Sequence, residues 1–271
     1  MMPIGGKTDK HPEFAIKFKG NEVDCERAIE LCSSLAQYDH SDIVKTVCDV
    51  VQQVTLNLAW YGYAVHEIIR DDEDNSKYHL YGFTSKRLFR LPRYFIQWVP
   101  KQDYEYLKKR YVIIPSTDIW EISIPSALGG ASGYKNMLLR LKRFEHIGPK
   151  FWRSDLENQI QTKGYNFQEY VLTTESYYRK ITKHWGWNRR DHSQRNCTEF
   201  FTIYKGITFR WAQAILREHI ISEINKLLSR LQINAKIVIA GIPLADDILR
   251  IRQELVDGKI DFQVAYDKSS I

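Results

Sequence analysis

Apolar residues recur at helical spacing in several stretches of the chain, whereas in other stretches they gather in short runs between turns. Between Ile43 and Leu58, apolar residues lie three or four positions apart, which predicts a helix over 41–60 with Ser41 as its N-cap and Gly62 at its end. Similar spacing predicts further helices over 23–36, 134–147, 207–232 and within 245–258.

The two long predicted helices each have an apolar face. In 134–147 the apolar stripe consists of Met137, Leu138, Leu141 and Phe144. In 207–232 the face consists of Ala212, Ile215, Leu216, His219, Ile220, Ile224, Leu227, Leu228 and Leu231. The charged residues expected to lie largely away from that face are Arg210, Arg217, Glu223, Lys226 and Arg230.

Between residues 62 and 125 the pattern changes to short runs of β-branched and aromatic residues, which prolines and turns separate. These runs predict strands at 63–70, 78–83, 93–99, 110–114 and 118–124. We expect this region to form one antiparallel sheet. Two more extended pieces are expected near the C-terminal end, at 235–241 and 259–266.

The predicted fold class is α+β, with a small antiparallel sheet subdomain inserted between long helices. The expected parts are an N-terminal helical part (1–61), a β-rich subdomain (62–125) and a helical core (126–271). Within the core, 151–200 is basic, aromatic and interrupted, and a strand, a helix and a strand follow at the end. A chain of 271 residues with 44% hydrophobic and 13% aromatic residues can bury a full core.

The positive charge of the chain is concentrated in one segment. The net charge is +6, but residues 135–195 contain thirteen Lys or Arg and six acidic residues, a local net charge of +7. Such a segment favours a polyanion, most often nucleic acid, although a solvated surface explains it equally well. The candidate contacts to double-stranded DNA are Arg140, Lys142, Arg143, Lys183, Arg189, Arg190 and Arg195.

Two tryptophans, Trp185 and Trp187, lie among these cations. Flat rings mixed with arginines can stack on bases and bind phosphates, whereas the alternative is that both rings fill the core between helices. No apolar run approaches the roughly 20 residues of a membrane span, and the N-terminus has no long apolar core, so neither a membrane partner nor a signal peptide is expected.

The stretch from Pro125 to Asn136, PSALGGASGYKN, gathers Gly129, Gly130 and Gly133 between a strand and a helix. It misses the G-x-x-x-x-G-K-[ST] phosphate loop and the G-x-S-x-G nucleophile elbow by one or two residues. An enzymatic role for Ser132 or Lys135 is therefore not favoured. We expect the three glycines to form a structural joint, and replacement of Gly130 or Gly133 to impair folding or assembly.

Other groups of possible ligands have simpler explanations. His66-Glu67 lacks the second histidine of H-E-x-x-H, and on a strand these side chains lie on opposite faces. His184, His192 and Cys197 match no common zinc spacing. Asp246 and Asp247 begin a helix, where capping explains them. No metal, cofactor or catalytic residue is expected.

Four cysteines occur without a C-x-x-C pair: Cys25, Cys32, Cys48 and Cys197. Three of them fall in predicted helices, where a small buried thiol is the simplest interpretation. A reducing, cytoplasmic setting fits this usage best.

The order of the stretches LNLAWYGYAVHEIIRD, FIQWVPK and VIIPSTDIWEISIPSALGGASGYKNMLLRL resembles the portal (head–tail connector) proteins of tailed bacteriophages and prophages. The late stretches ITFRWAQAILREHIISEINKLL and GIPLADDILRIRQELVDGKIDF resemble the same family. Together these stretches cover about half the chain. The chain is short for the family, and 151–200 would have to supply much of its stem and clip.

The resemblance implies a homo-oligomeric ring, usually of twelve subunits, at one capsid vertex, with the long helices in its core. Such a ring passes double-stranded DNA and docks the terminase, the capsid and the tail adaptors, in the virion or the host cytoplasm. It implies no enzyme and no cofactor. Two alternatives stay open: a basic nucleic-acid-binding or nucleic-acid-processing protein of a mobile element, and a structural or interaction protein without nucleic acid.

Overall fold

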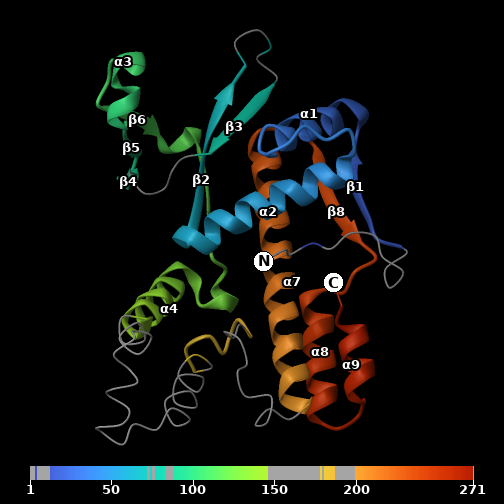
Figure 1. Cartoon of the computed structure of the whole chain (residues 1–271). Coiled ribbons are helices and arrows are strands. Elements are labelled where there is room, and N and C mark those ends of the chain that lie inside the picture. The colour runs from blue at the N-terminus through green and yellow to red at the C-terminus, as the bar shows by residue number, and fades with distance from the viewer. Residues whose placement is uncertain are drawn as a thin grey trace, which may run out of the picture. The chain divides into compact units, whose positions relative to one another are not determined.

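The computed structural model describes Ile4 and residues 13–71, 74, 77–82, 88–145, 178, 180–186 and 199–270 (Figure 1). The chain divides into two compact units. The first consists of Met1–Ile124 and Leu216–Ile242, and the second of Pro125–Ile215 and Pro243–Ser270. Helix α7 (Glu199–Arg230) contributes its N-terminal half to the second unit and its C-terminal half to the first.

Two helices of the first unit have well-formed ends. In α1 (Glu22–Ser33), the side chain of Asn21 accepts a hydrogen bond from the amide of Asp24. In α2 (Ile43–Tyr61), Asp42 is the N-cap, not Ser41 as expected, because its carboxylate accepts from the amide of Val44 at 2.9 Å. Gly62 ends α2 in the left-handed region, with φ of 80°.

The region between α2 and residue 125 contains two antiparallel sheets, and the expected single sheet is wrong. The first sheet has the order β3-β2-β7 and consists of β2 (Tyr63–Arg70), β3 (Tyr78–Gly82) and β7 (Ile119–Ser123). The second has the order β4-β5-β6 and consists of β4 (Leu88–Arg90), β5 (Tyr94–Trp98) and β6 (Tyr111–Pro115). A short helix, α3 (Tyr104–Leu107), lies between β5 and β6.

The two sheets pack against each other through one small apolar cluster. Val65 and Ile119 of the first sheet contact Phe95 and Ile114 of the second, and all four are buried. The opposite face of the first sheet carries Ala64, His66, Trp120 and Ile122, all buried, and α1 and α2 contact this sheet. Alternate side chains of β2 and β7 point to opposite faces of the sheet, so the strand register decides which residues lie on each face.

A two-stranded antiparallel sheet joins β1 (Ala15–Gly20) to β8 (Ala235–Ala240), with Phe18 opposite Ile237. The sequence pattern predicts β8 but gives no strand at β1. The partner of β1 lies more than two hundred residues away along the chain, so local pattern gives no indication of this pairing. Asn225 of α7 bonds to the backbone of Ile237 within the same unit.

The second unit contains α4 (Gly130–Glu145), the N-terminal half of α7, α8 (Ala245–Val256) and α9 (Phe262–Lys268). The expected strand at 259–266 is wrong, because α9 occupies most of it. Asp261 caps this helix by accepting from the amide of Val264 at 2.8 Å. A capping aspartate followed by helical packing therefore outweighs the strand-forming residues.

Helix α7 is longer and more buried than the pattern predicted. It begins at Glu199, eight residues before the expected start. Arg217, expected to lie away from the apolar face, is only 1% exposed, and burial lowers the pKa of its guanidinium. The α+β class is confirmed: small antiparallel sheets lie between helices along the chain.

Candidate interaction surface

The outward face of the β4-β5-β6 sheet is built from aromatic and aliphatic side chains. Register places Phe89, Ile96 and Ile113 in one row across the three strands. Trp98 lies opposite Tyr111 at one end of the sheet, with ring centroids 6.5 Å apart, and Tyr94 lies opposite Pro115 at the other end. Side chains on directly opposed residues share a face, so these seven residues form one surface, which we call the aromatic face.

The aromatic face is exposed, unlike the other face of the same sheet. The exposed fractions are 57% for Phe89, 48% for Tyr94, 46% for Trp98, 53% for Tyr111 and 54% for Ile113. Phe95 and Ile114, which lie between them in sequence, point the other way into the cluster with the first sheet. The exposed part is on the order of 500 Å², since a large aromatic side chain carries about 150–250 Å². That is near the upper end for an apolar patch on a monomer.

Cations border the aromatic face at both ends. Lys101, Lys108, Lys109 and Arg110 lie in the connection between β5 and β6, which joins Trp98 to Tyr111. Arg93 lies in the turn that leads into Tyr94. All five are exposed, and none makes an ion pair within the described part of the chain. Their charges are therefore available to an anionic ligand.

Sequence reasoning missed this surface, although a signal was present. A half-buried strand alternates apolar and polar residues. In YFIQW and YVIIP, however, apolar residues occupy both the odd and the even positions, and so both faces of the strand. That pattern ordinarily indicates a strand covered on both faces. Here the structure covers one face only, so the surplus apolar residues remain at the surface.

The predicted DNA contacts are only partly within the described residues. Arg140 and Lys142 are exposed on α4, and Lys183 is exposed in a turn. Arg143 belongs to α4, but its side chain lies outside the described part. Arg189, Arg190 and Arg195 also lie outside the described residues, so their role stays a prediction.

Trp185 fills the core of the second unit rather than stacking at a surface. It is buried, and its ring lies 5.2 Å from the ring of Tyr134 on α4, which is also buried. Burial raises the pKa of Tyr134. Met137 and Leu141 lie on the same buried side of α4, which confirms that part of the predicted stripe. Trp187, His192 and Cys197 lie outside the described residues.

The glycine segment forms a tight turn that leads directly into α4. Gly129 and Gly130 have φ of 97° and 64°, and the helix begins at Gly130 rather than at Tyr134. Gly133 lies inside the first helical turn without positive φ, and a Cβ there would meet nothing within 4 Å. The expectation that Gly133 is needed for folding is therefore not supported by its surroundings. Ser132 and Lys135 are exposed on α4.

His66 and Glu67 lie on opposite faces of β2, as expected. His66 lies opposite Trp120, with ring centroids 5.2 Å apart, and burial lowers the pKa of His66 to about 4. Its Nδ1 has no hydrogen-bond partner, and neither has Nε1 of Trp120. Burial and the nearby Asp118 raise the pKa of Glu67. No group of three or more His, Cys, Asp or Glu could hold a metal ion, among the residues the structure describes.

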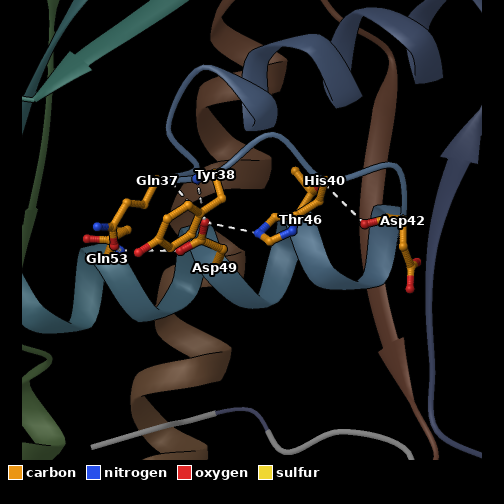
Figure 2. A network of polar contacts seen from close by, with 7 residues as sticks. All are labelled: Gln37, Tyr38, His40, Asp42, Thr46, Asp49 and Gln53. Carbon is orange, nitrogen blue, oxygen red and sulfur yellow. Dashed lines mark hydrogen bonds and ion pairs between the residues drawn. The ribbon is translucent and has the colours of Figure 1, made fainter.

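Asp49 on α2 collects hydrogen bonds from the loop that joins α1 to α2 (Figure 2). Its Oδ2 accepts from the backbone amides of Gln37 at 2.8 Å and Tyr38 at 3.1 Å, and lies 3.2 Å from Nε2 of His40. Nε2 of Gln53 donates to Oδ1. Burial raises the pKa of Asp49, but these hydrogen bonds together lower it below its ordinary value. The carboxylate is thus engaged in holding the loop.

The remaining candidates have structural roles. Oδ2 of Asp247 accepts from the amide of Leu244 at 3.2 Å, which confirms capping at the start of α8. Cys32 is a buried free thiol, and burial raises its pKa to about 12. For Cys48, burial first and Asp42 second raise the pKa to about 11. Low thiolate content makes both unreactive.

Comparison with known proteins does not assign a family. No family model matches the chain, and no curated protein matches it. Among the described residues, the helices are too short or too polar for any of them to cross a membrane.

Proposed function

We propose that this protein is a portal-like subunit that assembles into a ring at a capsid vertex and passes double-stranded DNA. The observation that carries the proposal is the order of its elements. Helix α2 passes through Gly62 directly into β2, two small sheets follow, and the glycine segment leads from β7 into α4. Helix α7, strand β8 and helix α8 come next. This is the order of the stretches that resemble portal proteins.

Two further features support an assembling subunit. Helix α7 has 32 residues, which at 1.5 Å per residue is about 48 Å. On α8, Leu249 and Val256 lie two helical turns apart and are both exposed, and Leu244 just before the helix is exposed too. Apolar residues grouped in this way suit contact with a neighbouring subunit.

The proposed partners are further copies of the chain, in a ring of about the family's usual twelve, and the terminase, capsid and tail adaptor proteins. The proposed setting is the virion and the host cytoplasm. The protein acts as a conduit and docking point, without a catalytic residue or cofactor. Exposed cations such as Arg140 and Lys142 would then lie near DNA.

Electron microscopy of the chain, alone and co-expressed with any capsid and terminase proteins found encoded beside it, tests this proposal. We expect closed rings with a central channel that admits duplex DNA. Particles that remain monomeric with those partners present would contradict it. Variants Leu249→Glu and Val256→Glu should reduce ring formation, whereas Val23→Glu, at an exposed apolar residue of α1, serves as a control for the added charge.

A second candidate is a nucleic-acid-binding protein of a mobile element, because Arg140 and Lys142 are both exposed on α4. Replacing both with Gln should then weaken duplex binding and lower its dependence on salt. The exposed lysine pair Lys19 and Lys236, opposed across β1 and β8, provides a matched control. Equal effects of the two double variants would argue against a DNA contact on α4.

A further inference from the structure

The aromatic face of the β4-β5-β6 sheet has no described element over it, yet it is the side of the sheet that carries most of the large rings. We propose that this face binds single-stranded nucleic acid. Bases stack on Tyr94, Trp98 and Tyr111, and phosphates pair with the cations at the two ends of the sheet. The proposed ring function does not assign a ligand to this surface.

The rings are spaced along and across the sheet. Tyr94 and Trp98 lie on the same face of β5, four residues apart, which is about 13 Å at 3.3 Å per residue. Tyr111 lies beside Trp98 on the next strand. Phe89 lies on the other neighbouring strand, opposite Ile96, at a level between the two rings of β5. An open sheet with exposed rings on adjacent strands offers a stacking platform to successive unpaired bases.

The charge around the sheet favours a polyanion. Residues 88–115 contain six basic and two acidic residues, a local net charge of +4. Arg90 belongs to the other face, where it pairs with Glu121 at 2.8 Å. The remaining five basic residues are the exposed cations at the ends of the aromatic face. A strand lying along β5 would therefore meet cations at both ends.

The exposed rings favour a single strand over a duplex. In a duplex, base faces are stacked inside the helix, so aromatic side chains on an open sheet cannot reach them. Phosphate contacts alone would not require aromatic rings at the surface. A site for duplex DNA would need cations, whereas this site combines cations with ring faces.

The same charges disfavour a second copy of the chain as the occupant. Two aromatic faces placed against each other would bring two sets of cations together, each set carrying the same sign. Like charges brought close at an interface cost several kcal/mol. The exposed area is about 500 Å², which is less than the roughly 800 Å² per partner of a standard stable interface.

The inference goes beyond the proposed oligomeric ring. It requires neither an oligomer nor a channel, because a single subunit carries the whole aromatic face. Fluorescence anisotropy of the full chain with labelled dT20 and with a 20-base-pair duplex, at about 50 to 200 mM salt, tests it. We expect dT20 to bind, and its affinity, unlike that of the duplex, to depend on the rings of the aromatic face. Trp98→Leu and Tyr111→Leu should each weaken dT20 binding at least fivefold, because stacking is lost while an apolar side chain remains.

Conservative and control variants sharpen the result. Trp98→Phe should retain most of the affinity, since it keeps a ring. Lys108→Gln with Lys109→Gln should lower the slope of affinity against salt, whereas Lys19→Gln with Lys236→Gln should not. Trp60→Leu, on α2 and 74% exposed, controls for removal of a surface tryptophan. Thermal melts verify that each variant folds, and the lysine pair supplies the test should Trp98→Leu not fold.

Three outcomes would overturn the inference. The first is unchanged dT20 affinity in Trp98→Leu and Tyr111→Leu with both variants folded. The second is duplex binding that Trp98→Leu and Tyr111→Leu weaken as much as they weaken dT20 binding, since the face would then not discriminate a single strand from a duplex. The third is self-association of the chain, measured by light scattering, that Trp98→Leu abolishes without changing dT20 affinity, since the face would then be an interface between copies. If the chain forms no oligomeric ring but still binds dT20, only the proposed function is contradicted.

Discussion

Asn225 on α7 forms two hydrogen bonds with the backbone of Ile237 in β8. Its Nδ2 donates to the carbonyl oxygen at 3.0 Å, and its Oδ1 accepts from the amide at 2.8 Å. A side-chain amide thus bonds to β8 as the backbone of a neighbouring strand would. Because β8 otherwise pairs only with β1 among the described strands, this contact satisfies backbone groups that a sheet edge would leave open.

Replacing Asn225 with Ala should destabilise the first unit. Ile237 is buried, so its amide and carbonyl groups would lose their partners without gaining water. We expect a loss of about 2 kcal/mol in the free energy of unfolding, measured by urea denaturation. Asn234→Ala, an exposed asparagine in the same unit, should change it by less than about 0.5 kcal/mol. Equal effects of the two changes would contradict the role assigned to Asn225.

His66 should make stability depend on pH. Because burial lowers its pKa from 6.5 to about 4, protonation favours the unfolded chain. Its contribution is complete above pH 6.5 and is lost as the pH falls towards 4, by up to about 3 kcal/mol. Urea denaturation between pH 7.5 and 4.5 measures this. His66→Gln should flatten the profile, because it removes the buried ring on which a proton is disfavoured, and an unchanged profile in this variant would contradict the role assigned to His66.

Two glycines of the second unit should respond in opposite ways to alanine. Gly186 has φ of 60°, and a Cβ there would lie 2.7 Å from the carbonyl oxygen of Lys205 on α7. Gly186→Ala should therefore cost about 2–4 kcal/mol. Gly133→Ala, in open space within a helix, should stabilise by about 0.4–1 kcal/mol. Thermal unfolding of both variants checks the pair, and destabilisation by Gly133→Ala would contradict our assignment.

Arg210 should hold α9 in the second unit. Its guanidinium lies 3.9 Å from the ring centroid of Tyr266 and donates to the carbonyl oxygen of Tyr266 and, at 2.9 Å, to Oγ of Ser269. Arg210→Ala should cost about 2 kcal/mol and speed hydrogen exchange in 262–268. Arg210→Lys should cause a loss of stability intermediate between the wild type and Arg210→Ala, because lysine keeps the positive charge but lacks the planar guanidinium group. Unchanged exchange in α9 would contradict this role.

The elements that local pattern defines were predicted well. Apolar residues of α2 repeat every three or four positions and Gly62 ends the helix, as predicted, although its N-cap is Asp42 rather than the predicted Ser41. The segment 63–70 matches β2 to the residue. The strand predicted at 259–266 is wrong. Its strand-forming residues Phe262, Val264 and Tyr266 compete with the capping Asp261, and the packing of Tyr266 against Arg210 favours the helix.

The candidate site was predicted less well than the fold. The concentration of positive charge predicted the DNA contacts within 135–195, and much of that segment lies outside the described residues. Apolar residues on both faces of β5 and β6 could be recognised from the sequence. The exposure of one of these faces to solvent could not be predicted from it. Whether Trp98 is covered depends on which elements pack against the sheet, and no local pattern records that.

The sequence by itself determined α1, α2, α4, α7 and α8, most strands and the position of the glycine turn, because caps, periodicity and backbone preference act over a few residues. The tertiary structure decided the pairing of β1 with β8, the division of 62–125 into two sheets and the burial of Arg217. It also left the aromatic face of β4-β5-β6 at the surface. These outcomes rest on contacts between residues far apart in the chain, whose energies appear only when the elements pack.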